Sequence, residues 1–277
     1  MRSLASRLGR IGLIVLAPVA GCETPTAQTC DSKAVVPSSS VDQPIPRPDA
    51  KWPNEPPGLT VVSDVALGMW TKNGWRCEGT GLSMVTDQAA SASQPGALVF
   101  TYGPGFPSGY APGVAYLDLP TPTPETYFGF WWKPSDPWQS HPSGVNKMAL
   151  LFPATSAGGT IYIMMFFDGA KYTIQVETTF SPDTRRLEPN LTTTPVALGT
   201  WHQIEWYVRY STSATSRDGV VRWWLDGVPQ GAYSDLQMPA DSGFTEYTIR
   251  PVWGGGIGDV KTQTDAYSYG RVHISRR

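Results

Sequence analysis

The sequence has little charge, few cysteines and histidines, and no helical pattern of apolar residues. Charged residues make up only 16% of the 277 residues, and there are 3 Cys and 3 His. No long segment repeats apolar side chains at the 3.6-residue period of an amphipathic helix. Basic residues (21) do not outnumber acidic residues (23). These shortages argue against a helical bundle, and the missing positive charge argues against a nucleic-acid-binding protein.

Turn formers and aromatic residues are abundant instead. The chain has 28 Gly and 26 Pro, and 12% of its residues are aromatic. From Gly58 onward, short segments alternate in polarity between turn signals. In "TYFGFWWK", for example, Phe128, Phe130 and Trp132 share one face. The pattern predicts one all-β sandwich domain over residues 58–277.

The N-terminus has the pattern of an export signal. Three arginines precede the apolar run of residues 11–20, which is too short to cross a bilayer as a helix. The run ends in "VAGC", which resembles the bacterial lipobox, so we expect a signal peptide over residues 1–21 and lipidation of Cys22. The alternative is ordinary cleavage of the signal peptide near this site, in which case Cys22 has no role in the processing. Because Glu23 replaces the Asp that typically retains lipoproteins in the inner membrane, we expect an exported lipoprotein of the outer membrane, on its periplasmic face or at the cell surface.

Residues 22–57 are rich in proline, serine and threonine, and they predict a flexible tether behind the lipid anchor. Loss of the signal peptide removes three arginines, so the basic count falls from 21 to 18 and the net charge becomes −5. An exported chain meets an oxidising compartment, so we expect a disulfide between Cys30 and Cys77, with two free thiols as the alternative. These two cysteines do not have the spacing of a metal site.

The most distinctive segment is an apparent hairpin at residues 199–227. It begins with "GTWHQIEWYVRY" and ends with "DGVVRWWLDG". A Gly-x-Trp-His opening, followed by a strand that ends in Leu-Asp-Gly, resembles a hairpin of the concanavalin A-like lectin/glucanase superfamily. Laminin G-like domains and jelly-roll polysaccharide lyases are members. The resemblance implies a two-sheet antiparallel jelly roll, but it does not select among lectins, hydrolases, lyases and adhesion modules.

Alternation assigns the faces of this hairpin. One parity predicts a core set: Ile204, Trp206, Val208, Tyr210, Val221, Trp223 and Leu225. Parity then requires paired positions to sum to an odd number. A sum of 429 pairs Tyr207 with Arg222 and Glu205 with Trp224, but other odd sums stay open because the loop at residues 211–219 does not fix the register. Flat rings stack on sugar rings, and arginine forks bind uronate carboxylates. The opposite face is therefore a candidate carbohydrate site: Gln203, Glu205, Tyr207, Arg209, Arg222 and Trp224. The alternative is a cross-strand ion pair of Glu205 and Arg222, with the rings packed under a loop.

Catalytic motifs are sparse. The Glu-x-Asp-x-x-Glu strand that similar glucanases carry is missing, which argues against retaining glycoside hydrolysis. A lyase needs a proton-transfer set beside a cation. The candidates are His141, in the loop "SDPWQSHPSGVNK", and His273, whose strand face is shared with Tyr269 and Arg271 by alternation. His202 has core parity, so we expect it to be structural.

Together these observations predict a membrane-anchored, extracytoplasmic jelly-roll lipoprotein that binds a polysaccharide. Two alternatives remain open: a polysaccharide lyase that acts on a uronate-containing glycan, and a structural or adhesion module that binds protein. We expect a monomer that contacts the membrane through its lipid anchor only and has no nucleic-acid partner. No cofactor is expected and no metal-binding residues stand out, although similarity to the superfamily leaves room for a structural calcium ion.

Overall fold

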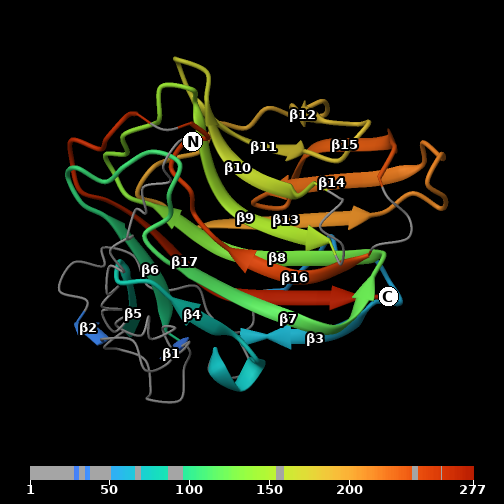
Figure 1. Cartoon of the computed structure of the whole chain (residues 1–277), viewed down its shortest axis with the longest axis horizontal. Helices are drawn as coiled ribbons and strands as arrows, with labels where there is room; N and C mark the ends of the chain where they lie inside the picture. The colour runs from blue at the N-terminus through green and yellow to red at the C-terminus, as the bar shows by residue number, and fades with distance from the viewer. Residues whose placement is uncertain are drawn as a thin grey trace, which may run out of the picture.

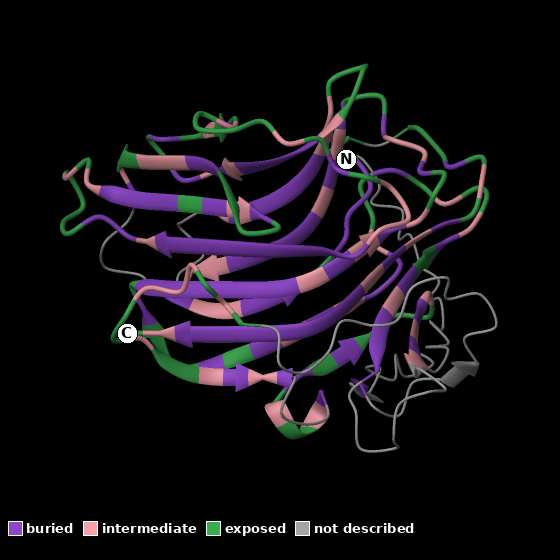
Figure 2. Cartoon of the chain, turned by 180° about the vertical axis from the view of Figure 1, so that it is seen from behind, coloured by how far each residue is buried: buried purple, intermediate pink, exposed green. Residues whose placement is uncertain are grey.

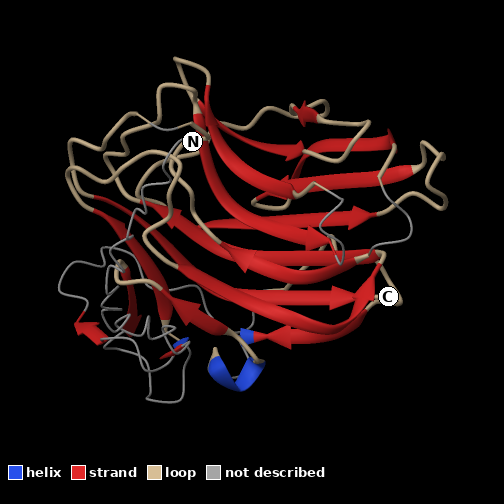
Figure 3. Ribbon diagram, in the orientation of Figure 1, coloured by secondary structure: helices blue, strands red, loops and turns tan. Residues whose placement is uncertain are grey.

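The computed structural model describes residues 28–30, 35–37, 51–65, 70–86, 96–153, 159–238, 243–256 and 258–277. Over these residues the chain forms two sheets (Figure 1). All neighbouring strands pair antiparallel except β2 and β5. Strands dominate the described chain, and a visible exception is one turn of 3-10 helix, η3 (Thr71–Asn73) (Figure 3). The predicted β-sandwich is therefore confirmed.

The first sheet has eight strands. Their order across the sheet is β1 (Gln28–Thr29), β4 (Arg76–Glu78), β7 (Val114–Thr123), β16 (Phe244–Ile249), β9 (Val145–Pro153), β10 (Ile161–Phe167), β11 (Tyr172–Thr178) and β12 (Arg185–Leu187). Neighbours in space are often distant in sequence, since β16 lies between β7 and β9. This crossing of the chain between layers is typical of a jelly roll.

The second sheet has nine strands, eight of them in its main order. They are β15 (Val228–Leu236), β14 (Gly219–Leu225), β13 (His202–Arg209), β8 (Glu125–Pro134), β17 (Asp265–Arg276), β6 (Ala97–Tyr102), β5 (Leu82–Thr86) and β2 (Val35–Pro37), with β3 (Thr60–Asp64) paired to β17 beside this path. The hairpin predicted over residues 199–227 is β13–β14. Its register pairs Tyr207 with Arg222 and Glu205 with Trp224, which is the sum of 429 among the odd sums that the parity argument allows.

The core lies between the two sheets and is rich in aromatic rings. Figure 2 shows most strand residues buried, while exposed residues gather in the loops. Contacts cross the interface directly: the Phe128 ring lies 5.7 Å from that of Tyr247, and Trp223 Nε1 donates to the Ile174 carbonyl at 3.0 Å. All seven hairpin residues with core parity are buried in this cluster, which confirms their predicted orientation.

The last strand departs from simple alternation. Tyr267 and Tyr269 are buried in the core, and so are Val272 and Ile274, although the two pairs have opposite parity. The register of β17 shifts between residues 270 and 273, where Arg271 adopts a φ of 53°. A bulge of this kind reverses which face later residues occupy. The prediction that Tyr269 shares a face with His273 was therefore wrong.

The upstream segments are attached to the domain. Cys30 and Cys77 form a disulfide, with Cα atoms 4.9 Å apart, and β1 pairs with β4 beside it. Residues 51–57, hereafter the strap, lie against the nine-stranded sheet: Gln203 Nε2 donates to the Lys51 carbonyl at 2.7 Å. Packed structure thus begins upstream of residue 58. The predicted signal peptide and Cys22 lie outside the described residues. Within the described part of the chain, no helix is long and apolar enough to cross a membrane.

Candidate functional site

The outer face of the eight-stranded sheet carries a band of polar and aromatic side chains. In β10, Ile161, Ile163 and Met165 point into the core, so Tyr162 and Met164 point outward. Register extends this parity across the sheet. The resulting cross-strand row is Arg76, Tyr116, Thr248, Leu150, Tyr162, Glu177 and Arg186. It crosses six strand intervals, roughly 28 Å at 4.7–4.9 Å each. Such a row suits an extended ligand.

At the centre of this face, Lys147 lies beside two members of the row, Tyr162 and Glu177. Lys147 Nζ lies 4.3 Å from the centroid of the Tyr162 ring. Burial raises the pKa of Tyr162, and a hydrogen bond to Glu177 raises it further. Burial lowers the pKa of Lys147; the nearby Arg250 adds to this effect, while Glu177 opposes it. The group thus places a partly desolvated amine beside a phenol that stays protonated.

Cations lie over aromatic rings at three places on this face. Besides the Lys147–Tyr162 pair, the Arg76 guanidinium lies 4.6 Å from the centroid of Tyr116. The Arg186 guanidinium lies 4.3 Å from that of Phe166. Each such pair combines a cation with a flat apolar surface, which suits a sugar ring bearing a carboxylate. Arg76 is also ion-paired with Asp118 and Arg186 with Glu188, so a ligand carboxylate would share these cations with protein carboxylates.

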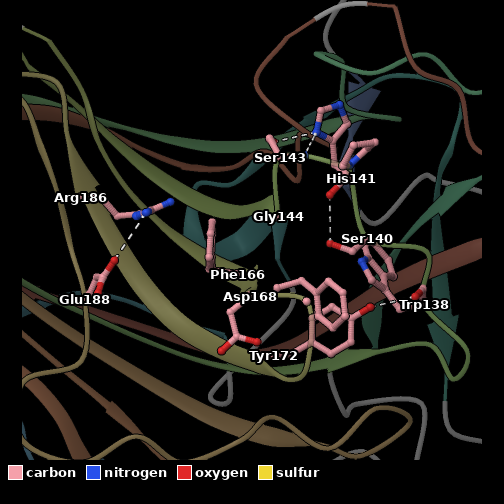
Figure 4. A pocket seen from close by; sticks show the side chains of 13 residues that line it. Trp138, Ser140, His141, Ser143, Gly144, Phe166, Asp168, Tyr172, Arg186 and Glu188 are labelled. Atoms are coloured by element: carbon pink, nitrogen blue, oxygen red, sulfur yellow. Dashed lines mark hydrogen bonds and ion pairs between the residues drawn. The ribbon is translucent and has the colours of Figure 1, made fainter.

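A pocket of about 810 Å³ opens where this face ends at the β10–β11 turn (Figure 4). Phe166 and Arg186 belong to both the face and the pocket. Most of the other lining residues come from two connections. The loop between β8 and β9 supplies Trp138, Ser140, His141, Pro142, Ser143 and Gly144, and the β10–β11 turn supplies Phe167, Asp168, Gly169 and Tyr172. Glu188, just after β12, completes the lining. Figure 4 shows Ser143 and His141 on one side, and Arg186 with Glu188 on another. The pocket and the face are therefore continuous.

His141 is held firmly in the pocket wall. Its ring is buried, and the Trp253 ring meets it edge-on at 5.1 Å. Its Nδ1 lies 2.7 Å from Ser143 Oγ, and its Nε2 lies 3.3 Å from Asp259 Oδ2. Gly254, at φ +77°, packs so closely that a Cβ there would lie 2.4 Å from His141 Cδ2. The ring of the predicted candidate His141 is thus fixed in position by contacts on several sides.

The predicted carbohydrate residues of the hairpin come together on the outer face of the nine-stranded sheet, where the strap covers part of them. Glu205 is fully buried. Its carboxylate accepts hydrogen bonds from the Tyr127 hydroxyl at 2.6 Å and from the backbone and side-chain nitrogens of Asn54 at 3.0 and 2.8 Å. Tyr207 is buried and donates to Glu125 at 2.9 Å. These groups already have protein partners in the described structure.

The rest of that face is more open. Arg222 is exposed, and Trp224 is half-buried against the apolar cluster that includes Trp52. Arg209 donates to the Asp218 carbonyl at 3.3 Å. Gln203 is buried and bonded to the strap. Sugar binding by these residues stays a prediction.

The remaining predicted catalytic residues lie elsewhere. His273 is buried under the strap, with Nδ1 3.1 Å from Asp64 and Nε2 3.2 Å from Glu55. Burial lowers its pKa, but the two carboxylates outweigh this effect and leave the pKa above the ordinary value. The Tyr269 hydroxyl donates to the Met148 carbonyl in the core at 3.2 Å, and Arg271 is buried at the bulge. The structure therefore separates His141 from this group.

His202 has the expected structural environment. It is buried, Nδ1 lies 2.7 Å from Asp226, and Nε2 lies 2.8 Å from the Ala197 carbonyl. Among the described residues, no group of three or more His, Cys, Asp or Glu side chains is arranged to hold a metal ion. The expected possibility of structural calcium stays open.

Sequence reasoning missed the group of Lys147, Tyr162, Glu177 and Arg250. The segment "TIYIMMFF" is apolar throughout, so it predicts a strand buried on both faces. A weak signal exists in the next strand, "KYTIQVETT", where Gln175 and Glu177 alternate with apolar residues. The sequence does not show that β9, β10, β11 and β16 are neighbours.

Comparisons with known proteins agree with this architecture. No family model matches the chain, and no curated protein matches its sequence. Similar solved structures include alginate lyase vAL-1 from a Chlorella virus, with a TM-score of 0.58, 11% identity, and coverage of 79% of this chain and 100% of that one. Another is alginate lyase Aly36B, with a TM-score of 0.52, 15% identity, and coverage of 66% and 81%.

An endo-β-1,4-glucuronan lyase from the fungus Trichoderma reesei is also similar, with a TM-score of 0.51, 16% identity, and coverage of 71% of this chain and 87% of that one. At these identities the likeness concerns the fold. Two packed sheets, the crossing connections and these structural neighbours lead to one conclusion: the described chain has the fold of a two-sheet jelly-roll sandwich.

Proposed function

We propose that the outer face of the eight-stranded sheet binds an acidic, uronate-containing polysaccharide. The observation that carries the proposal is the set of three cation–aromatic pairs on one continuous sheet face. Aromatic rings stack on sugar rings, and Arg and Lys bind carboxylates through charge-assisted hydrogen bonds. The similarity of fold to alginate and glucuronan lyases supports this substrate class.

A second candidate function, β-elimination, is favoured by the group at Lys147. A uronate lyase needs a base for the proton at C5 and a donor for the leaving oxygen at C4. Burial lowers the pKa of Lys147, which increases the fraction of neutral amine available as base. The protonated phenol of Tyr162 would donate to the leaving oxygen. The C4–O bond breaks, and a C4–C5 double bond forms.

The test incubates the purified protein with polyuronates and with neutral glycans, and measures binding by calorimetry and elimination by ultraviolet absorbance. Lys147→Ala and Arg250→Ala should each weaken polyuronate binding about tenfold or more, because a hydrogen bond to a charged group contributes roughly 1.5–3 kcal/mol. Arg222→Ala, which removes an exposed arginine from the opposite sheet, is the matched control.

Loss of binding in Arg222→Ala, with Lys147→Ala and Arg250→Ala unaffected, would place the site on the hairpin face and overturn the proposal. Saturable binding without a rise in ultraviolet absorbance would support a carbohydrate-binding role and rule out lyase activity on the glycans tested. A protein that binds no glycan of the panel would favour an adhesion module.

We also propose that the protein is exported and held at the membrane by a lipid on Cys22, as a monomer. The support is the lipobox-like "VAGC" and, for an oxidising compartment, the Cys30–Cys77 disulfide. Cys22→Ala should move the protein from the membrane fraction to the soluble fraction and abolish labelling by a fatty-acid analogue. An unchanged membrane fraction would contradict the lipid anchor.

A further inference from the structure

We propose that Ser143, His141 and Asp259 form a nucleophile, a base and an orienting carboxylate that hydrolyse acyl esters of sugar hydroxyls. Ser143 and His141 line the pocket, and Asp259 lies beside the opposite nitrogen of the His141 ring, so the three follow one another in the order that acyl transfer to a serine requires. The choice of a sugar ester as substrate rests on the proposed polysaccharide function, whereas the serine chemistry does not.

The hydrogen bonds around His141 define the tautomer that this chemistry needs. The backbone N–H of Ser143 donates to Nδ1 at 3.1 Å, so Nδ1 carries a lone pair and the ring proton is on Nε2. Nε2 lies 3.3 Å from Asp259 Oδ2, close enough for charge attraction, but forms no hydrogen bond with it in this structure. The Ser143 hydroxyl lies 2.7 Å from the same Nδ1 and can pass its proton there. Asp259 stabilises the imidazolium that results.

The surroundings keep this geometry fixed while leaving the nucleophile accessible. His141 is only 6% exposed, between the edge of Trp253 and the backbone of Gly254. Ser143 is exposed and lines the open pocket.

The reaction is balanced with water as the only co-reactant. Ser143 Oγ bonds to the acyl carbon as its proton moves to His141 Nδ1. The bond from the acyl carbon to the sugar oxygen breaks, and that oxygen takes the proton from His141. Water then attacks the acyl-serine, giving up a proton through His141 to Ser143 Oγ, and a carboxylic acid leaves.

The substrate class follows from where the pocket lies. Phe166 and Arg186 line both the pocket and the proposed polyuronate face, so a chain bound on that face can bring a substituent to Ser143. The aromatic side chains of Trp138 and Tyr172 supply an apolar wall for an acyl group. An acylated polyuronate combines both requirements.

The test uses the full-length protein with 4-nitrophenyl acetate, with an acetylated polyuronate, and with a fluorophosphonate probe whose attachment is mapped by mass spectrometry. We expect ester hydrolysis and labelling of Ser143. Ser143→Ala should abolish the labelling and lower the hydrolysis rate on the order of 10³-fold or more, as loss of a serine nucleophile does. Ser234→Ala, an exposed serine on β15, is the matched control and should change neither readout.

Polyuronate binding separates this proposal from the proposed function. Ser143→Ala should retain it, because the exposed hydroxyl is not part of the cation–aromatic set. Asp259→Asn should keep the labelling site but slow the labelling and shift its pH profile, since Asp259 acts through His141. Absence of labelling at Ser143, or hydrolysis at an equal rate in Ser143→Ala, would overturn the proposal, whatever the result for polyuronate binding.

Discussion

Replacement of Lys261 by Met should destabilise the protein strongly, because Lys261 is a buried cation that ties the pocket loops together. Its ammonium forms an ion pair with Asp265 and donates to the Gln139 carbonyl at 3.0 Å. It also lies 4.0 Å from the centroid of Trp138 and 4.9 Å from that of Trp253. Both side chains of the ion pair are 0% exposed.

The magnitude follows from what the substitution leaves behind. Removal of one partner of a buried ion pair costs about 3–5 kcal/mol, since the other charge stays buried without compensation. Asp265 keeps two hydrogen bonds, from the Gln139 backbone N–H at 3.0 Å and from Gln263 Nε2 at 2.6 Å, so a value near the lower limit is expected. In a domain of this size, each kcal/mol lowers Tm by roughly 2–4 °C.

The assay is urea unfolding of Lys261→Met against the parent protein, with Lys72→Met, at an exposed lysine, as control. The control should stay within about 0.5 kcal/mol of the parent. Adding Asp265→Asn to Lys261→Met should recover part of the loss, because no buried charge then remains unpaired. If the free energy of unfolding of Lys261→Met lies within about 0.5 kcal/mol of the parent value, the reasoning is refuted.

Three further predictions concern other parts of the fold. The pKa of His273 is raised in the folded state, so its contribution to stability is complete below the unfolded pKa and is lost as pH rises through the folded pKa. Unfolding free energies measured from mildly acidic to mildly basic pH should show this decline, and His273→Gln should flatten it. Reduction of the Cys30–Cys77 disulfide should lower the unfolding free energy by up to about 4 kcal/mol in the loop-entropy estimate, given its sequence separation of 47; no change on reduction would contradict a structural role. Gly254→Ala should both strain a left-handed φ and displace the His141 ring. It should therefore slow probe labelling of Ser143 while lowering Tm only a little, and an unchanged labelling rate would show that the ring tolerates the contact.

The sequence predicts the local structure of the hairpin well. Alternation alone gives the orientation of both strands, because residues such as Trp206 and Trp223 must be buried and their partners follow by parity. The same argument limits the register to odd sums, and the structure selects the one that pairs Tyr207 with Arg222. It fails at β17, because one residue, Arg271, takes a left-handed conformation that carries no side-chain signal.

The candidate site was beyond sequence reasoning for a topological reason. Lys147 lies on β9 and Tyr162 on β10, whereas Arg250 directly follows β16, which reaches its place between β7 and β9 after a long excursion of the chain. The strap was missed for a different reason. Its proline-rich composition predicts a tether, yet Asn54 supplies the hydrogen bonds that let Glu205 be buried.

The disulfide near the N-terminus has a mechanical consequence. A pull on the chain upstream of Cys30 passes through the bond to Cys77 and enters the domain at β4. The residues between the two cysteines, which include the strap and β3, lie outside this covalent path, so the tension does not act on them. A polypeptide held at its N-terminal end can therefore move in a flowing medium without peeling the strap from Glu205 and His273.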